Sequence, residues 1–307
     1  MKKFTKIIGT IAVVFAIFGI VMLCIGLLGG GASITKQLAS NEKVDIVSEL
    51  LGIKSKLNFV YNDDFNFSSK HQIYKNETGE YTPKGEQIDS LYVQISGGEI
   101  QMVSHTGEDF KVDFDGMGKF QAYVEDGTLY VRGEKEGVQV DFGTITIHVP
   151  QNTSLRQAKV ELGVGTMDVD FIQAENLKLS VGAGELNVER MQSNTTELEV
   201  GAGEINIRTA DISDLYAEVG MGEIQLDGKI LGNIDASVAL GEMDLELADT
   251  TETEHNYDLS CAAGEMIIGS KNYAGLGVST EIDHGAQTTY KLDCALGSMK
   301  LGFSDGR

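Results

Sequence analysis

Five glycine-containing units decide the fold of this chain of 307 residues. Each begins 19 residues after the one before it, and they read LGVGT (162–166), VGAGE (181–185), VGAGE (200–204), VGMGE (219–223) and VALGE (238–242). Copies at wider spacing read ISGGE (95–99), CAAGE (261–265) and CALGS (294–298). A constant spacing of this length is typical of proteins built from stacked structural repeats.

Apolar side chains recur at four places around each unit. If the first residue of a unit is position zero, they stand at positions −2, 0, +5 and +7, for example Leu179, Val181, Leu186 and Val188. The first two positions share one parity and the last two share the other. Each repeat therefore predicts two β-strands, each with one buried face, separated by a bend at the glycines. Glycine is expected in the bend because it permits backbone angles that other residues avoid.

A unit of two strands cannot bury its own apolar face, but identical units can bury theirs by stacking. Each strand then pairs in parallel with the same strand of the next coil, about 4.8 Å away. The sequence thus predicts an all-β protein, a parallel β-solenoid (single-stranded β-helix) with coils of about 19 residues, over residues 90–302. The alternative is a set of hairpins in an antiparallel sandwich, which would need tight turns and no fixed repeat.

The first thirty residues predict a membrane segment. Residues 7–28 carry no charge and follow Lys2, Lys3 and Lys6. As a helix this stretch matches the thickness of a bilayer core, so we expect a transmembrane helix at 7–29 and a cytoplasmic tail at 1–6. The positive-inside rule then places the rest outside, as the extracellular part of a single-pass protein of the cell membrane. The alternative is a signal peptide cleaved near 31–33.

The remaining segments and the composition set further limits. Residues 30–89 lack the repeat and are interpreted as a stalk and an N-terminal cap, and residues 303–307 as a C-terminal tail. The formal net charge of −22 would repel phosphate backbones, which excludes nucleic acid as a partner. Tryptophan is absent and aromatic residues make up 7%, so no aromatic stacking platform is expected.

A column of glutamates is the main candidate for chemistry. It occupies the last position of the unit in coil after coil, at Glu185, Glu204, Glu223, Glu242 and Glu265. Stacking would place these carboxylates about 4.8 Å apart on the outside, where they repel one another. They form either a solvated acidic rail or a ladder that Ca²⁺ bridges. A general acid/base pair would need a groove over the rail, and the sequence shows none. Next to them, Asn187, Asn206, Gln225 and Asp244 predict a ladder of polar side chains.

Two cysteines replace the usual valine at position zero. Cys261 and Cys294 are therefore expected inside the solenoid as free buried thiols, with a disulfide as the alternative if their coils are adjacent. The chain carries no zinc, nucleophile or phosphate-binding motif. We therefore expect no catalytic residues and no cofactor, and we predict that the protein is not an enzyme.

The chain stops soon after the last unit, which leaves the final coil without an obvious cover. Open parallel coils invite edge pairing with another molecule. Either the insertion at 270–289 folds over this end, or the C-terminal coil associates with another molecule, including a second copy of the chain.

A membrane segment followed by spaced G-x-G-E/T-I/L-x-I/V units resembles the bacterial "putative adhesin" β-strand-repeat family, a domain of unknown function. The resemblance covers roughly 90–302. It implies a β-solenoid displayed at the bacterial cell envelope, with a link to envelope stress in some relatives, and it brings no catalytic residues. The leading expectation is a non-enzymatic display, adhesion-like or interaction module that contacts an envelope protein or a glycan. The alternatives are a polysaccharide-acting enzyme, a self-associating scaffold and a Ca²⁺-dependent binder.

Overall fold

A computed structural model describes residues 67–304, except for residues 117, 135–142, 152 and 274–275. The predicted transmembrane helix at 7–29 and most of the predicted stalk lie outside the described residues. Within the described part, no helix is long and apolar enough to cross a membrane.

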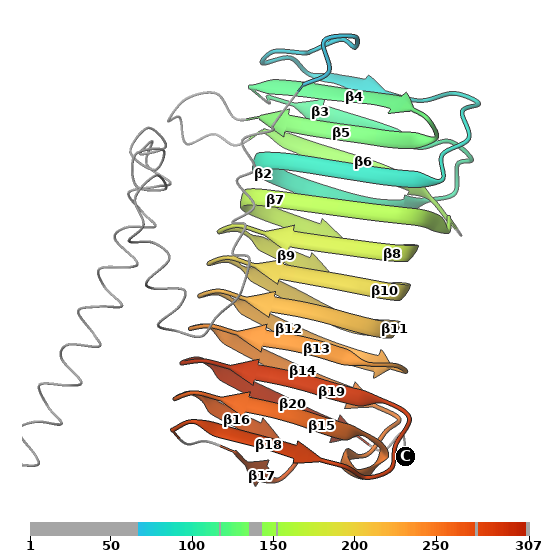
Figure 1. Cartoon of the computed structure of the whole chain (residues 1–307). Coiled ribbons are helices and arrows are strands. Elements are labelled where there is room, and N and C mark those ends of the chain that lie inside the picture. The colour runs from blue at the N-terminus through green and yellow to red at the C-terminus, as the bar shows by residue number, and fades with distance from the viewer. Residues whose placement is uncertain (1–66, 117, 135–142, 152, 274–275, 305–307) are drawn as a thin grey trace, which may run out of the picture. The chain divides into compact units, whose positions relative to one another are not determined.

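Each 19-residue repeat forms one coil of two strands joined by a glycine corner (Figure 1). Equivalent strands of neighbouring coils pair in parallel and in register, so that Leu179 lies beside Leu198, which lies beside Ala217. The predicted parallel stacking of the repeats is confirmed, and the antiparallel sandwich is wrong for them. Antiparallel pairs occur only at the two ends of the described stack.

The upstream sheet consists of the strands that end at a glycine corner and of the antiparallel strands that pair with them at the two ends of the stack. The downstream sheet consists of the strands that begin at a corner and of their antiparallel partners. In spatial order the upstream sheet is β4 (Lys119–Glu125), β5 (Thr128–Glu134), the first half of β2 (Ser90–His105), the first half of β7 (Leu155–Val169), β8 (Ile172–Val181), β10 (Met191–Val200), the second half of β11 (Glu204–Val219), β13 (Ile234–Val238), β19 (Thr289–Cys294), β15 (Asn256–Cys261) and β18 (Val278–Ile282). The downstream sheet is β1 (Gly79–Tyr81), β3 (Lys111–Asp115), β6 (Thr144–Pro150), the second halves of β2 and β7, β9 (Glu185–Val188), the first half of β11, β12 (Glu223–Ile230), β14 (Glu242–Ala248), β20 (Ser298–Ser304), β16 (Glu265–Ile268) and β17 (Lys271–Asn272).

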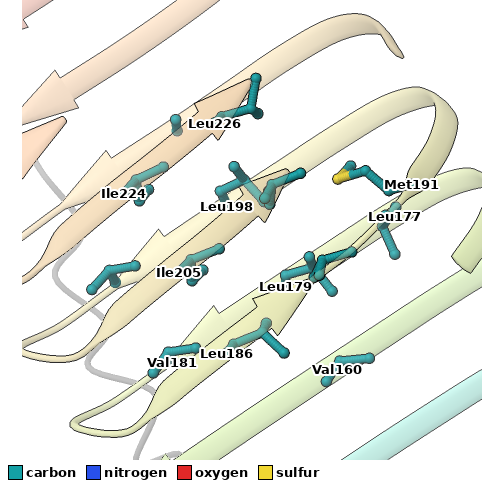
Figure 2. Packing of buried hydrophobic residues seen from close by; sticks show 14 of the residues in the cluster. Val160, Leu177, Leu179, Val181, Leu186, Met191, Leu198, Ile205, Ile224 and Leu226 are labelled. Carbon is teal, nitrogen blue, oxygen red and sulfur yellow. The ribbon is translucent and has the colours of Figure 1, made fainter. Parts of the chain in front are cut away.

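The core lies between the two sheets and consists of stacked aliphatic columns. Leu179 and Ile224 are completely buried and Val200 is 4% exposed, as the alternation predicts. Figure 2 shows Leu179 and Leu198 in successive upstream strands, with Leu186 and Ile205 from the downstream strands in the same interior. Because the side chains of each coil also pack against those of the coils on either side, the columns hold the stack together.

The corner glycines serve close packing of the backbone. Among the corners from 182 to 241 no glycine has a positive φ, so the expectation that they relieve forbidden angles is wrong for these coils. Instead, a Cβ on Gly184 would lie 2.6 Å from the carbonyl oxygen of Gly165, and one on Gly201 would lie 2.8 Å from that of Gly182. The backbone ladder continues through the corner, where the amide of Ala202 donates to the Gly182 oxygen at 2.7 Å.

The coil order at both ends differs from the sequence order. The coil of β2 lies between the coil of β5 and β6 and that of β7. At the other end, the coil of β19 and β20 lies between that of β13 and β14 and that of β15 and β16. Between β2 and β7, the described residues form one outer coil, made of β5 and β6, and the strands β3 and β4.

Antiparallel strands close both ends of the stack. At one end β4 pairs with β5 and β3 pairs with β6, and β1 pairs with β3 in turn. At the other end β18 pairs with β15 and β17 pairs with β16, so the insertion at 270–289 covers the last coil. Of the two alternatives for this end, the insertion that folds over it is confirmed. The C-terminal coil itself is not open, because β19 and β20 have a parallel neighbour on each side. Self-association of the chain stays a prediction that this structure does not test.

The final strand, β20, runs to Ser304, past the expected end of the repeat domain at residue 302. Phe303 packs against the core and so belongs to the last strand instead of to a C-terminal tail. Its ring also stacks on that of His255, with 6.3 Å between the ring centroids.

Candidate functional site: a groove along the glycine corners

The glycine corners line a groove with a volume of about 1080 Å³, which we call the corner groove. It crosses the coils, because each corner contributes the same positions to its wall. Its lining residues are Gly165, Thr166, Ala183, Gly184, Glu185, Ala202, Gly203, Glu204, Met221, Gly222, Glu223, Leu240, Gly241, Glu242, Ala263, Gly264, Glu265, Leu296, Gly297 and Ser298. The sequence did not predict a groove here, because the groove depends on the shape that the corners adopt when they stack.

The predicted glutamate column forms one wall of the corner groove. Glu185, Glu204, Glu223 and Glu242 stand side by side on adjacent coils. Thr166 lies beside Glu185 at one end and Ser298 beside Glu242 at the other. Glu265 is separated from this run by Ser298, because the coil of β19 and β20 is inserted there. The expected five-step ladder is therefore corrected to four consecutive carboxylates, followed by a hydroxyl and one further carboxylate.

Amide side chains of the same strands hold these carboxylates. Asn187 Nδ2 donates to Glu185 Oε1 at 2.9 Å, and Asn206 Nδ2 donates to Glu204 Oε1 at 2.8 Å. Asn206 Nδ2 also donates to Asn187 Oδ1 at 3.1 Å, so part of the predicted polar ladder is present. It does not continue to Gln225, whose amide donates to Glu223. The amides fix the carboxylates but leave their charges uncompensated.

The column carries negative charge without ion pairs. None of the salt bridges between described residues involves the four consecutive glutamates, and Lys300, on the same sheet, binds Asp244 and Glu246. Neighbouring carboxylates about 4.8 Å apart repel by about 0.9 kcal/mol in bulk water and by more near a protein surface. A ligand that carries positive charge would relieve this repulsion.

The second wall of the groove is apolar. The middle residue of each corner has an apolar side chain. These residues are Ala183, Ala202, Met221, Leu240, Leu296 and Ala263. Leu296 is 48% exposed and provides contact area for a ligand. The corner groove thus joins a row of carboxylates to a row of small and aliphatic side chains.

The groove does not assemble a metal cage. Across the part of the chain that the structure describes, no three His, Cys, Asp or Glu side chains are grouped closely enough to hold a metal ion. Each pair of neighbouring coils offers two carboxylates, whereas Ca²⁺ takes six to eight oxygen ligands. The hypothesis of a calcium ladder on Glu185, Glu204, Glu223, Glu242 and Glu265 gains no support from this geometry.

An aromatic cluster near the first coils was missed by the sequence analysis. The rings of Tyr123 and Tyr130 stack with centroids 4.9 Å apart, and Tyr92 meets Tyr130 edge to face at 5.7 Å. The guanidinium carbon of Arg132 lies 5.2 Å from the Tyr130 centroid, and His71 stacks on Tyr123. The low aromatic content of the sequence had predicted no aromatic stacking. The cluster forms because β5 lies beside β2, and the sequence order conceals that pairing.

On the outer face of the upstream sheet, Glu218 lies close to other carboxylates. Glu218 lies between Glu199 and Ser237 on adjacent coils. Burial, together with the charges of Glu199 and Glu197, raises the pKa of Glu218. The folded state therefore binds this proton more tightly than the unfolded state does. Above the ordinary glutamate range the charged group lowers stability, and this penalty disappears as the pH falls below that range.

We expect Glu218→Gln to raise the melting temperature at pH 7 and to have little effect near pH 4. Thermal unfolding followed by circular dichroism at both pH values checks this expectation. Glu197→Gln is the matched control, because Glu197 Oε1 accepts a hydrogen bond from Lys178 Nζ at 2.9 Å and its loss removes an ion pair. An equal gain from both variants at pH 7 would show that general charge reduction, and not the site of Glu218, is responsible.

Stacked coils with closed ends and one long groove define an all-β repeat protein of the β-solenoid type. The chain matches the family described as Toastrack DUF4097 over residues 32–291, and it belongs to that family. The resemblance that the glycine units predict is thereby confirmed.

Solved structures show distant similarity. A "putative adhesin" from Bacteroides fragilis is 15% identical, with 74% of this chain and 98% of that chain covered and a TM-score of 0.40. A "putative cell adhesion protein" from Clostridium sporogenes is 11% identical, with 74% and 100% covered and a TM-score of 0.30. A "putative lipid binding protein" from Parabacteroides distasonis is 11% identical, with 73% and 96% covered and a TM-score of 0.39. No curated protein matched the chain.

Proposed function

We propose that this protein is a non-enzymatic, adhesion-like interaction module at the bacterial cell envelope, and that the corner groove is its contact surface. The N-terminal segment at 7–29 would anchor it in the cell membrane and place the solenoid outside. The observation that carries the proposal is the groove itself. It presents four consecutive carboxylates that form no ion pair with another described residue, beside half-buried Met221 and Leu240 and exposed Leu296.

The geometry favours an extended polymer that carries amino groups. The groove crosses several coils, so a ligand that lies along it would meet a carboxylate about every 4.8 Å. The apolar wall offers contact area for the body of the ligand, and the amides of Asn187 and Asn206 keep the carboxylates in place without neutralising them. An amine-bearing glycan of the envelope has this combination of length, charge and apolar faces.

Binding of the full chain to immobilised chitosan tests this proposal, with N-acetylated chitin as the neutral control ligand. We expect the double variant Glu204→Gln/Glu223→Gln to weaken binding to chitosan about tenfold, since each exposed charge contact contributes up to about 1 kcal/mol. Binding should also fall with added salt. Glu175→Gln/Asp211→Asn removes the same charge from exposed positions outside the groove and should bind like the native chain.

Three results would contradict the proposal. Equal binding to the acetylated polymer would exclude recognition of amino groups. An equal loss of chitosan binding in the control variant would show that the overall charge of the protein, and not the groove, is responsible for binding. Cleavage of the polymer by the native chain, abolished by Glu223→Gln, would identify a polysaccharide-acting enzyme.

A further inference from the structure

Two buried cysteines lie side by side between the outermost coil and its neighbour. Cys261 of β15 and Cys294 of β19 are register partners in the parallel ladder, and their side chains are 1% and 2% exposed. Both stand at the corner position that valine occupies in the central coils. Their 33-residue separation in the sequence conceals this pairing, which exists because the last coil is inserted inside the one before it.

Both thiols are free in this structure and are held within the packed corner. The thiol of Cys294 donates to the Gly297 oxygen at 3.2 Å, and Cys261 is close enough to share a hydrogen bond with it. Burial, with a contribution from Cys261, raises the pKa of Cys294 to about 11. A thiol with so little thiolate at neutral pH reacts slowly while the coil is closed.

The outermost coil, together with β18 and β17, forms the edge of the stack at this end. β15 and β16 have a full parallel neighbour on one side, but on the other side they have only β18 and the two-residue strand β17. Edge elements with few long-range partners open most readily. A covalent link between β15 and β19 would act where opening begins.

We propose that Cys261 and Cys294 form a disulfide site that clamps the outermost coil to its neighbour. Register partners on parallel strands are about 4.8 Å apart, inside the range of Cα separations that a disulfide spans. The valine that the other coils carry at this position would pack equally well, so packing alone does not require cysteine here. The closed loop from 261 to 294 contains β16, β17 and β18, so one bond restrains the whole capped end.

The reaction is a thiol–disulfide exchange with a disulfide donor as the oxidant. The thiolate of one cysteine attacks the donor, forms a mixed disulfide and releases one donor thiol. The thiolate of the other cysteine then attacks the protein sulfur of that mixed disulfide, forms the Sγ–Sγ bond and releases the second donor thiol. The two protons lost by the cysteines end on the two released thiols. Since both sulfurs are buried, the rate of disulfide formation should depend on how often β18 and β15 open.

The test uses the full chain with Cys24→Ser, so that only these two cysteines remain. The chain is incubated with oxidised glutathione and digested without reduction. We expect a linked peptide pair that contains Cys261 and Cys294, formed faster in mild denaturant. We also expect hydrogen exchange at residues 256–268 to slow at least about tenfold in the oxidised chain.

Cys261→Val and Cys294→Val are matched controls, because each installs the side chain that the other coils carry. Both variants should fold, and the oxidant should not change their exchange at 256–268. Absence of the linked pair even in denaturant that opens the coil would overturn the proposal. Linkage between two chains, or linkage within one chain without slower exchange, would overturn it as well.

Discussion

Val219→Asp should cost at least about 4 kcal/mol of unfolding free energy and should disrupt several coils. Val219 is 3% exposed and stands in the column between Val200 and Val238. A carboxylate there has no water, and the column gives it only aliphatic neighbours. Because each coil is stabilised through its interfaces with the next, the loss of one rung also weakens those on either side. Denaturant unfolding should show a lower midpoint, and hydrogen exchange should increase in β8 to β13.

Tyr216→Asp is the matched control for this prediction. Tyr216 belongs to the same strand, β11, but points outward and is 51% exposed. The new carboxylate would lie beside Glu197 and Asp235, so a small loss from repulsion is expected. A loss as large as that of Val219→Asp would mean that charge, and not burial, decides the effect.

The buried variant should also respond to pH in a defined direction. Burial raises the pKa of an aspartate, so the folded variant binds a proton more tightly than its unfolded state. The difference in stability from the native chain should therefore shrink as the pH falls through the range of that raised pKa. A difference that is independent of pH would show that the damage comes from shape alone.

The interior of the repeats was predictable because its signal is local and periodic. The alternation around Leu179, Val181 and Leu186 specifies which face of each strand is buried, and the 19-residue spacing then specifies the partner of each residue. Once the strands are parallel and in register, the core columns and the glutamate wall follow. No tertiary information beyond the repeat is needed for them.

The ends of the stack and the groove could not be predicted in this way. Cys294 pairs with Val238 on one side and with Cys261 on the other, and no regular spacing in the sequence indicates this. The Tyr92–Tyr130 contact has the same origin at the opposite end. At one end the coil of β2 lies inside the coil of β5 and β6, which follows it in the sequence. At the other end the coil of β19 and β20 lies inside the coil of β15 and β16, which precedes it. The groove depends on the shape of the stacked corners, and a residue pattern does not show that shape.

Gly203→Ala should lower the unfolding free energy by about 3 kcal/mol, through overpacking at the corner. The added Cβ would overlap the carbonyl oxygen of Gly184 and would lie 2.7 Å from Val181 Cγ1 and 2.8 Å from the Gly184 nitrogen. Two of these three atoms belong to the backbone of the neighbouring corner, and the Gly184 oxygen accepts a hydrogen bond from the Glu204 amide at 2.9 Å, so they cannot move aside without disturbing the ladder. Equilibrium unfolding in urea measures the loss.

The sign of this effect separates two roles of the corner glycines. Gly203 does not have a positive φ, so alanine fits its backbone angles and should stabilise the chain by about 0.4–1 kcal/mol if space were available. Destabilisation therefore reports the close approach of neighbouring corners, and stabilisation would contradict it. Ala202→Ser, at the exposed adjacent position, should change stability by less than about 0.5 kcal/mol. A large loss from that variant too would show that the corner tolerates no change, whatever the distance to the next coil.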